Sequence, residues 1–127
     1  MHIDAEARDA NSASIVLKMS CGTVDFLLTG DIDSKVESSI VSSFGAAVDI
    51  EVLKVAYHGS RYSSSEQFLS ATSPEIAVIS AGAGNTYGHP HEEALERLEA
   101  SGATIYRTDM NGTMVITTDG VDWSVIT

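Results

Sequence analysis

The sequence predicts an α/β fold in which one mixed β-sheet is flanked by helices. Short apolar runs that are typical of buried strands alternate with segments whose apolar residues recur at a helical spacing. This alternation favours parallel neighbours in the sheet, and a β-hairpin near the front of the chain would add an antiparallel strand. The 127 residues fit one domain, which we place at 14–127 after a polar lead-in over 1–13.

The first expected strands form a hairpin, and a buried strand follows farther along. SIVLKM at 14–19 and VDFLLTG at 24–30 are β-rich runs on either side of a turn that contains glycine. EVLKVA at 51–56 is short, mostly apolar and bounded by loops. Such a run is expected of a strand that is buried on both faces of a sheet.

A helix is expected between these strands. Val36, Ile40 and Phe44 follow one another at a four-residue step, so all three should lie on its inner face. The pattern predicts a helix over about 33–44, with Gly45 near its end.

The second half continues the alternation. A serine caps a short helix near Glu66, Ser73-Pro74 ends this helix, and EIAVIS at 75–80 is another buried strand. The next helix should carry Pro90 in its first turn and end at Gly102. Its inner stripe would be Ala94, Leu95 and Leu98.

Three short strands are expected at the end of the chain. They are ATIYRT, TMVITT and VDWSVIT. Asn111-Gly112 is a strong hairpin signal between the first two, and Asp119-Gly120 is a second turn.

Composition limits the partners and the location. The net charge of −11, from 18 acidic and 7 basic residues, disfavours sequence-independent binding to a phosphate backbone. The single cysteine, Cys21, excludes an internal disulfide. No run approaches the roughly 18 apolar residues of a membrane helix, and the polar start has no signal-peptide core. We expect a chain that is soluble as written, cytoplasmic by default, without membrane contact by this segment.

Polar side chains follow the expected strands directly. Asp31 follows LLTG, His58 follows KVAY, and Asn85 and His89 lie in the loop after 75–80. The carboxyl ends of parallel strands share one rim, where α/β proteins collect catalytic groups. A carboxylate and an imidazole are natural ligands of zinc or manganese. Alternatively, Asp31 is the N-cap of the following helix and His58 is an ordinary hydrogen-bonded side chain.

Two further segments allow more than one interpretation. In GAGNTYGHPH at 82–91, the glycines between Gly82 and Gly88 could cradle a phosphate or a nucleotide, although the loop matches no established phosphate-binding motif. Ser60 lacks an acid and a base partner, so a hydroxyl that orders its loop is favoured over a nucleophile.

Several stretches together resemble a known family. They are LLTGDI, VLKVAYHGSRYSSS, PEIAVISAGAGNTYGHPHEEALERL and GATIYRTDMNGTMVITTDG. In this order they are similar to the second half of the metallo-β-lactamase-like domain of ComEC-type competence proteins, from about Ser14 to the end. The resemblance implies that Asp31 bridges two metal ions and that His58 binds one of them, both as catalytic residues. It places His89 beside the metal site as a substrate contact or extra ligand, unless His89 only locks its loop.

Asn85 and Ser60 are further candidate substrate-binding residues at this site. The chain departs from the family at Tyr57, where the family often has a second histidine. It also lacks the HxHxDH motif of such hydrolases, and its other histidines are His2, His89 and His91. Catalytic zinc usually takes three protein ligands, so binding of a divalent metal, zinc or manganese, should be weak or absent in the isolated chain.

The resemblance implies the C-terminal half of an αββα metallo-β-lactamase-like sandwich. A lone half would expose an apolar sheet face, so we expect a homodimer or a separate N-terminal half-domain as its partner. The implied function is the C-terminal portion of a two-metal hydrolase that acts on phosphodiesters such as DNA during DNA uptake, inactive or nearly so alone. A chain cut from a ComEC-like parent would be membrane-associated. The alternative is a non-catalytic binding or assembly module that retains the half-fold as a scaffold.

Overall fold

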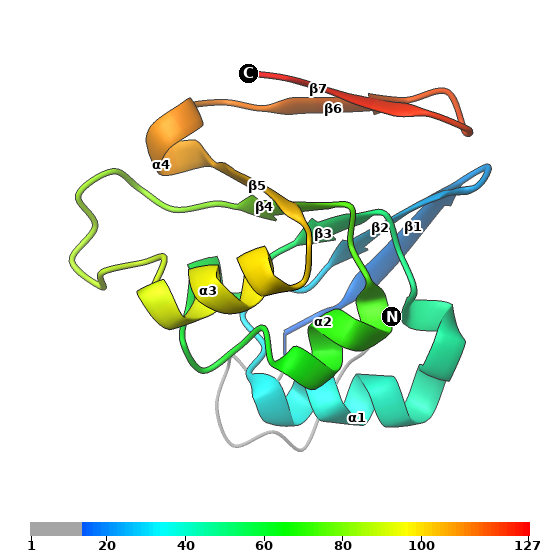
Figure 1. The fold of residues 1–127 in the computed structure, drawn as a ribbon, viewed down its shortest axis with the longest axis horizontal. Helices are drawn as coiled ribbons and strands as arrows, with labels where there is room; N and C mark the ends of the chain where they lie inside the picture. Colours follow the sequence, from blue (N-terminus) through cyan, green and yellow to red (C-terminus); the bar gives the residue numbers. More distant parts are fainter. Residues whose placement is uncertain (1–13) are drawn as a thin grey trace.

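A five-stranded mixed sheet with helices on one face forms the body of the protein (Figure 1). The computed structural model describes residues 14–127, so the lead-in predicted over 1–13 lies outside the described residues. The strands are β1 (Leu17–Cys21), β2 (Val24–Leu28), β3 (Val52–Lys54), β4 (Ile76–Ile79), β5 (Thr104–Arg107), β6 (Val115–Thr118) and β7 (Trp123–Ile126). The helices are α1 (Ser34–Phe44), α2 (Glu66–Thr72), α3 (Glu92–Ala100) and α4 (Thr108–Asn111), with 3-10 turns η1 (Gly45–Val48) and η2 (Ala56–Gly59).

The order of strands in the main sheet is β1-β2-β3-β4-β5. The β1–β2 pair is the predicted antiparallel hairpin, whereas β2, β3, β4 and β5 pair in parallel. The predicted mixed α/β sheet is therefore confirmed. Because β2 to β5 run in the same direction, their carboxyl ends lie along one edge of the sheet.

The hydrophobic core lies between this sheet and helices α1, α2 and α3. Leu27, Leu53, Ala77 and Ile105 are register partners on four adjacent strands, and all four belong to the core cluster or pack against it. Side chains alternate between the two faces of a strand, so this row fixes the helix-covered face. The core residue Phe68 is 1% exposed and comes from α2, which Ser65 caps as predicted.

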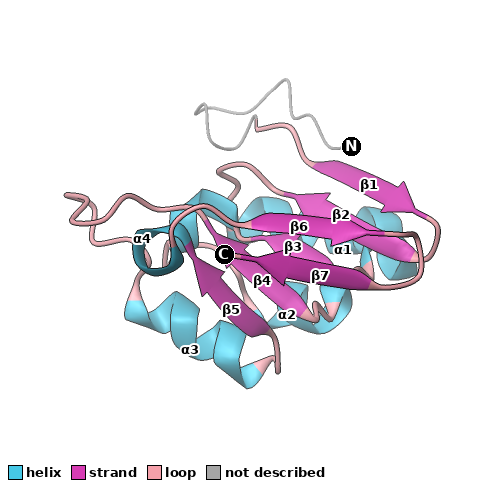
Figure 2. Ribbon diagram, turned by 90° about the horizontal axis from the view of Figure 1, so that it is seen from above, coloured by secondary structure: helices cyan, strands magenta, loops and turns pink. Residues whose placement is uncertain are grey.

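The β6–β7 hairpin lies on the opposite face of the sheet, away from α1, α2 and α3 (Figures 1 and 2). On this face Val52 and Ile76 are only 4% and 1% exposed. The indole N–H of Trp123 donates to the carboxylate of Glu75 at 2.7 Å and fixes the hairpin to the sheet. The layers are therefore helices, main sheet and a short two-stranded sheet.

The hairpin leaves the outer strand of the main sheet uncovered. Leu17 and Met19 of β1 remain 40% and 45% exposed. The predicted turn at 119–120 does join β6 to β7, and the Gly120 carbonyl accepts the backbone N–H of Thr23 at 2.7 Å. The turn end of the hairpin therefore reaches the β1–β2 pair.

The hairpin predicted at Asn111-Gly112 is wrong. Residues Thr108–Asn111 form α4, which separates β5 in the main sheet from β6 in the small sheet. The Asn111 side chain accepts the backbone N–H of Arg107 at 2.9 Å, and the Arg107 guanidinium binds Asp109 at 2.8 Å. The hydrogen bond from Arg107 lowers the pKa of Asp109. These bonds close a helical turn where the sequence pattern predicted a two-residue hairpin.

Two helix details also differ from the sequence prediction. Val36 and Ile40 are buried as expected, but Phe44 is 47% exposed because α1 ends there and the chain enters η1. Pro90 lies before the first turn of α3, which begins at Glu92. Within the described part of the chain, no helix is long and apolar enough to cross a membrane.

Candidate active site at the carboxyl edge of the sheet

Asp31 and His58 meet just beyond the ends of β2 and β3. Asp31 Oδ1 lies 3.5 Å from His58 Nε2, and both side chains are partly exposed, at 38% and 46%. The two segments are joined directly, because the backbone N–H of Tyr57 donates to the Gly30 carbonyl at 2.9 Å. The parallel pairing of β2 with β3 thus brings together two residues that the sequence placed on one rim.

A backbone contact sets the orientation of the His58 ring. Nδ1 lies 2.7 Å from the carbonyl oxygen of Ser80, which can only accept a hydrogen bond. Nδ1 therefore carries a proton, and Nε2 is the ring nitrogen next to the Asp31 carboxylate. A proton or a metal cation between Nε2 and Oδ1 would be held by both groups.

The helix-capping role considered for Asp31 belongs to another residue. The N-cap of α1 is Asp33, whose carboxylate accepts the N–H groups of Lys35 and Val36 at 3.1 Å each. Asp31 contributes no side chain to this cap. Its carboxylate is therefore available to His58.

The turn that carries His58 has an unusual backbone. Tyr57 and His58 have φ values of 52° and 55°, which is the left-handed region that non-glycine residues rarely adopt. Gly59 follows at φ 81°, and a Cβ there would lie 2.6 Å from the Cβ of Pro90. The absence of a side chain at Gly59 lets the loop over 82–91 approach His58 closely.

The Asn85 side chain organises this loop. Its amide NH2 donates to the carbonyls of Gly82 and His89 at 2.9 and 2.7 Å. Its oxygen accepts the N–H groups of Tyr87 and His89 at 3.1 and 3.0 Å. In this structure the polar atoms of Asn85 are directed at its own loop.

His89 lies at the centre of a group of rings. Its ring centroid is 4.7 to 6.0 Å from those of Tyr57, His58, Tyr87 and His91. Burial is the main cause that lowers the pKa of His89, and His91 and His58 lower it further, while Asp31 opposes them. A neutral ring at neutral pH follows from this shift.

His91 joins the loop over 82–91 to the loop that follows His58. Nδ1 accepts the backbone N–H of Arg61 at 2.9 Å, so Nε2 carries the proton and donates to the Tyr87 carbonyl at 3.1 Å. The Arg61 guanidinium also pairs with Glu93 at 3.2 Å. Here it is His91 that locks the loop through backbone hydrogen bonds.

A buried carboxylate binds the backbone of the segment that follows His58. Glu37 of α1 is 0% exposed and accepts the N–H groups of Ser64 and Ser65 at 2.6 and 3.0 Å. Burial raises the pKa of Glu37 to about 7, against the hydrogen bonds from both serines and the attraction of Arg97. Ser60 is 1% exposed, and its oxygen accepts the Tyr62 N–H at 3.2 Å.

Sequence reasoning missed Lys54, which ends β3 near Asp31. Burial lowers the pKa of this ammonium group, and attraction to Asp31 opposes the shift. Nζ donates to the carbonyl of Val55 at 3.2 Å. The signal was visible as the one lysine within the mostly apolar run 51–56.

As a metal centre the pair is incomplete. Among residues 14–127, no three His, Cys, Asp or Glu side chains are grouped closely enough to hold an ion. The donors present, a carboxylate and an imidazole with its other nitrogen bonded to a carbonyl, fit zinc or manganese in kind. Two donors are fewer than the three that catalytic zinc takes.

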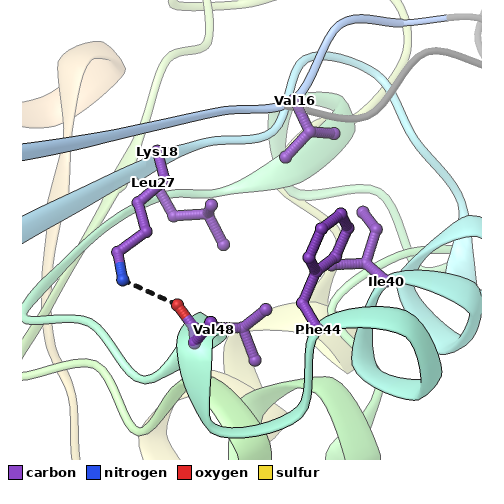
Figure 3. Close-up of a pocket in the computed structure, with 7 residues that line it drawn as sticks. Val16, Lys18, Leu27, Ile40, Phe44 and Val48 are labelled. Atoms are coloured by element: carbon purple, nitrogen blue, oxygen red, sulfur yellow. Dashed lines mark hydrogen bonds between the residues drawn. The ribbon is translucent and has the colours of Figure 1, made fainter.

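Two pockets differ in chemistry. One of about 180 Å³ adjoins the pair and is lined by His58, Ala81, Gly82, Asn85, Tyr87 and His89. The other, of about 90 Å³, lies at the β1 edge of the sheet, where Val16, Leu27 of β2 and Phe44 of α1 converge (Figure 3). At its rim Lys18 Nζ donates to the Ala47 carbonyl at 2.7 Å. Of these two pockets, the first contains polar side chains of the candidate site, His58, Asn85 and His89.

Comparison with known proteins shows which proteins this chain is similar to. No protein-family model matches the chain. The competence protein ComA of Neisseria gonorrhoeae is 43% identical over 106 residues, which cover 84% of this chain and 15% of that protein. The ComE operon protein 3 of Bacillus subtilis is 39% identical over 104 residues, covering 82% of this chain and 13% of that protein. Recombination protein 2 of Haemophilus influenzae is 37% identical over 105 residues, covering 83% and 13%.

The matched regions cover most of the described sheet and helices but only about a seventh of the length of each relative. Identities of 37 to 43% over more than 100 residues establish common descent for that segment. The chain is therefore a homologue of a short segment of the competence protein ComA, and of the corresponding segments of ComE operon protein 3 and recombination protein 2.

Proposed function

We propose that this chain is the C-terminal portion of a ComEC-type, metallo-β-lactamase-like hydrolase that acts on DNA phosphodiesters during DNA uptake. One observation carries the proposal, namely the contact between Asp31 and His58 at the carboxyl edge of the sheet, 3.5 Å apart. The Ser80 carbonyl accepts the Nδ1 proton, so Nε2 is the ring nitrogen that could bind a metal beside the carboxylate. Homology to a protein named for competence supports DNA as the substrate.

Each residue of the site has a defined part in this proposal. Asp31 and His58, the latter through Nε2, would hold divalent ions, zinc or manganese. When bound, such ions activate a water molecule and offset the negative charge on the phosphoryl oxygens. Lys54 adds a positive charge near Asp31, which partly offsets the acidity of the chain toward a phosphate substrate. Ser60 and Glu37 hold the loop that follows His58.

The remaining metal ligands must come from outside the described residues. The uncovered part of β1 offers a place for a second layer, because Leu17 and Met19 are 40% and 45% exposed beside the β6–β7 hairpin. An N-terminal half-domain packed on this face would complete a sandwich and bring its ligands to the same edge. A second copy of the chain could cover the same face, but it would bring another Asp31–His58 pair and no new type of ligand.

Calorimetric titration with manganese, and then zinc, tests the proposal on the chain itself. We expect weak binding that Asp31→Asn abolishes. Asp33→Asn is the matched control, because it removes the same charge two residues away and leaves an N-cap that asparagine can fill. Its titration should match that of the unchanged chain.

A fusion tests the activity. The chain is joined behind the segment that precedes the matched region in the Neisseria gonorrhoeae relative, so that an N-terminal half is present. We expect manganese-dependent cleavage of DNA that Asp31→Asn abolishes and Asp33→Asn retains. Metal binding and cleavage that both survive Asp31→Asn would show that the pair is not the metal site. A fusion that binds metal but leaves DNA intact would favour a non-catalytic binding module.

A further inference from the structure

A group of aromatic rings lies beside Asp31, and His58 is the one member of this group that has a part in the hydrolysis proposed above. Four rings surround His89, with centroid separations of 5.6 Å to Tyr57, 6.0 Å to His58, 5.7 Å to Tyr87 and 4.7 Å to His91. These separations lie in the range of favourable aromatic pairs. The rings form a continuous aromatic surface that ends at the His58 metal-ligand candidate.

Tyr87 is the outermost ring of this group. It is nearly parallel to His89, at an interplanar angle of 18°, and the Tyr87 residue is 76% exposed. The Tyr87 ring therefore lies beside His89 and is largely open to solvent. His89 is in turn stacked on His58 at 26°, so the column Tyr87, His89, His58 leads from solvent to the site.

The backbone of Tyr87 is fixed although its ring is exposed. Its N–H donates to the side-chain oxygen of Asn85 at 3.1 Å, and its carbonyl accepts the N–H of His91 at 3.1 Å. Tyr62 is almost as exposed, at 66%, yet it belongs to none of the ring pairs found among residues 14–127. An exposed aromatic residue whose backbone is already fixed has less freedom to lose when a ligand stacks on its ring.

The adjoining pocket limits the size of what can enter. It measures about 180 Å³ and is lined by Tyr87, His89 and His58 together with Asn85 and Gly82. Pockets for whole drug-sized ligands occupy about 300 to 1,000 Å³. This pocket fits one planar ring system of a larger molecule.

The charge of the chain indicates what kind of contact must supply affinity. With a net charge of −11, the protein has little capacity to bind a polyanion by displacing its counterions. Stacking of bases on aromatic side chains does not depend on that capacity, and it accepts any base because every base has a π-face. It requires a base that is not already paired and stacked within a duplex.

We propose that Tyr87 and His89 form a stacking platform that holds one unpaired base of single-stranded DNA next to the Asp31–His58 pair. The inference rests on the proposed function for its choice of DNA, and it makes the substrate of that site a single strand. The platform positions the strand, whereas Asp31 and His58 face the phosphate.

Fluorescence anisotropy in EDTA tests the platform without any metal. The probes are a labelled thymine octamer, an abasic octamer with the same phosphates, and a duplex that contains the thymine octamer. We expect the chain to bind the thymine octamer at least about fivefold more tightly than the abasic strand, which is the effect of one stacked base. The duplex should bind as weakly as the abasic strand. Raising salt from 50 to 200 mM should weaken binding far less than the roughly 10³-fold loss of a phosphate-driven binder.

Three variants locate the effect. Tyr87→Ala should bind the thymine and abasic strands equally, while Tyr87→Phe, which keeps the ring, should retain the preference. Because only the Tyr87 backbone bonds to Asn85 and His91, neither change removes a hydrogen bond within the loop. Tyr62→Ala is the control for an exposed tyrosine outside the ring group and should behave like the unchanged chain.

Equal binding of the thymine and abasic strands by the unchanged chain would overturn the inference, and so would a preference that survives Tyr87→Ala. Absence of binding to any strand would overturn it as well. The proposed hydrolase function fails separately, because it is judged by metal binding and cleavage at Asp31. A preference for unpaired bases without metal binding or cleavage would support the stacking platform and contradict the proposed hydrolase function.

Discussion

Replacing Glu37 with glutamine should remove a defined part of the pH dependence of stability. Glu37 is fully buried, and desolvation raises its pKa from 4.5 to about 7. Between these values the unfolded chain has released the proton that the folded chain still holds. Stability therefore falls as pH rises through this window, and it falls by about 3 kcal/mol for a shift of about 2.5 units at 1.36 kcal/mol each.

The Glu37→Gln variant cannot ionise, so this loss should be absent from it. Its amide keeps one acceptor for the N–H groups of Ser64 and Ser65 but turns an NH2 toward the other, which costs about 1 to 3 kcal/mol at any pH. We expect the variant to be clearly less stable than the unchanged chain at pH 4.5. The two stabilities should then converge or cross by pH 7.5.

Urea unfolding at half-unit steps from pH 4.5 to 8, followed by the fluorescence of Trp123, measures both curves. Glu96→Gln is the matched control, since it makes the same substitution at an exposed glutamate of α3. A difference between Glu37→Gln and the unchanged chain that stays constant across the range would refute the reasoning. It would mean that Glu37 titrates in the folded protein as it does in the unfolded chain.

Two pairs of substitutions each compare a residue of the site with a matched control elsewhere in the chain. Gly59→Ala and Gly45→Ala both place a Cβ at positive φ, at a cost of about 1 to 3 kcal/mol each, but only the former sets it 2.6 Å from Pro90. We expect Gly59→Ala to lower the unfolding free energy, measured in urea, by at least about 1 kcal/mol more than Gly45→Ala does. Equal losses from the two variants would show that the loop over 82–91 moves aside without cost. Asp33→Ala should lower the unfolding free energy by about 1 kcal/mol through loss of the α1 cap, whereas Asp31→Ala should leave it within about 0.5 kcal/mol. A larger loss from Asp31→Ala would argue that Asp31 supports the helix after all.

The sheet was predictable because its signals are local and agree with one another. Continuous apolar runs marked β3 and β4, and β-rich runs around a glycine turn marked β1 and β2. Parallel pairing then brought Asp31 and His58 to one edge without any knowledge of their contact. Their 3.5 Å separation depends on the Tyr57 to Gly30 hydrogen bond, which no periodicity encodes.

Other features were hidden because they depend on distant neighbours. A glutamate such as Glu37 looks like a solvent-facing residue of α1, and its burial follows from the N–H groups of Ser64 and Ser65, about 27 positions away. The Asn111-Gly112 signal failed because the Asn111 side chain bonds back to Arg107 and closes a helical turn. In both cases a side-chain to backbone bond overrode the local pattern.

The β6–β7 hairpin should be locally less stable than the main sheet on which it packs. A two-stranded hairpin has marginal stability in water by itself, and this one is fixed to the main sheet mainly by the Trp123 to Glu75 and Thr23 to Gly120 bonds and by the apolar face beneath it. It should therefore open locally at a smaller free energy than β2 to β5, and each opening would bare Val52 and Ile76. A partner that arrives at this face would meet a surface that can widen to receive it.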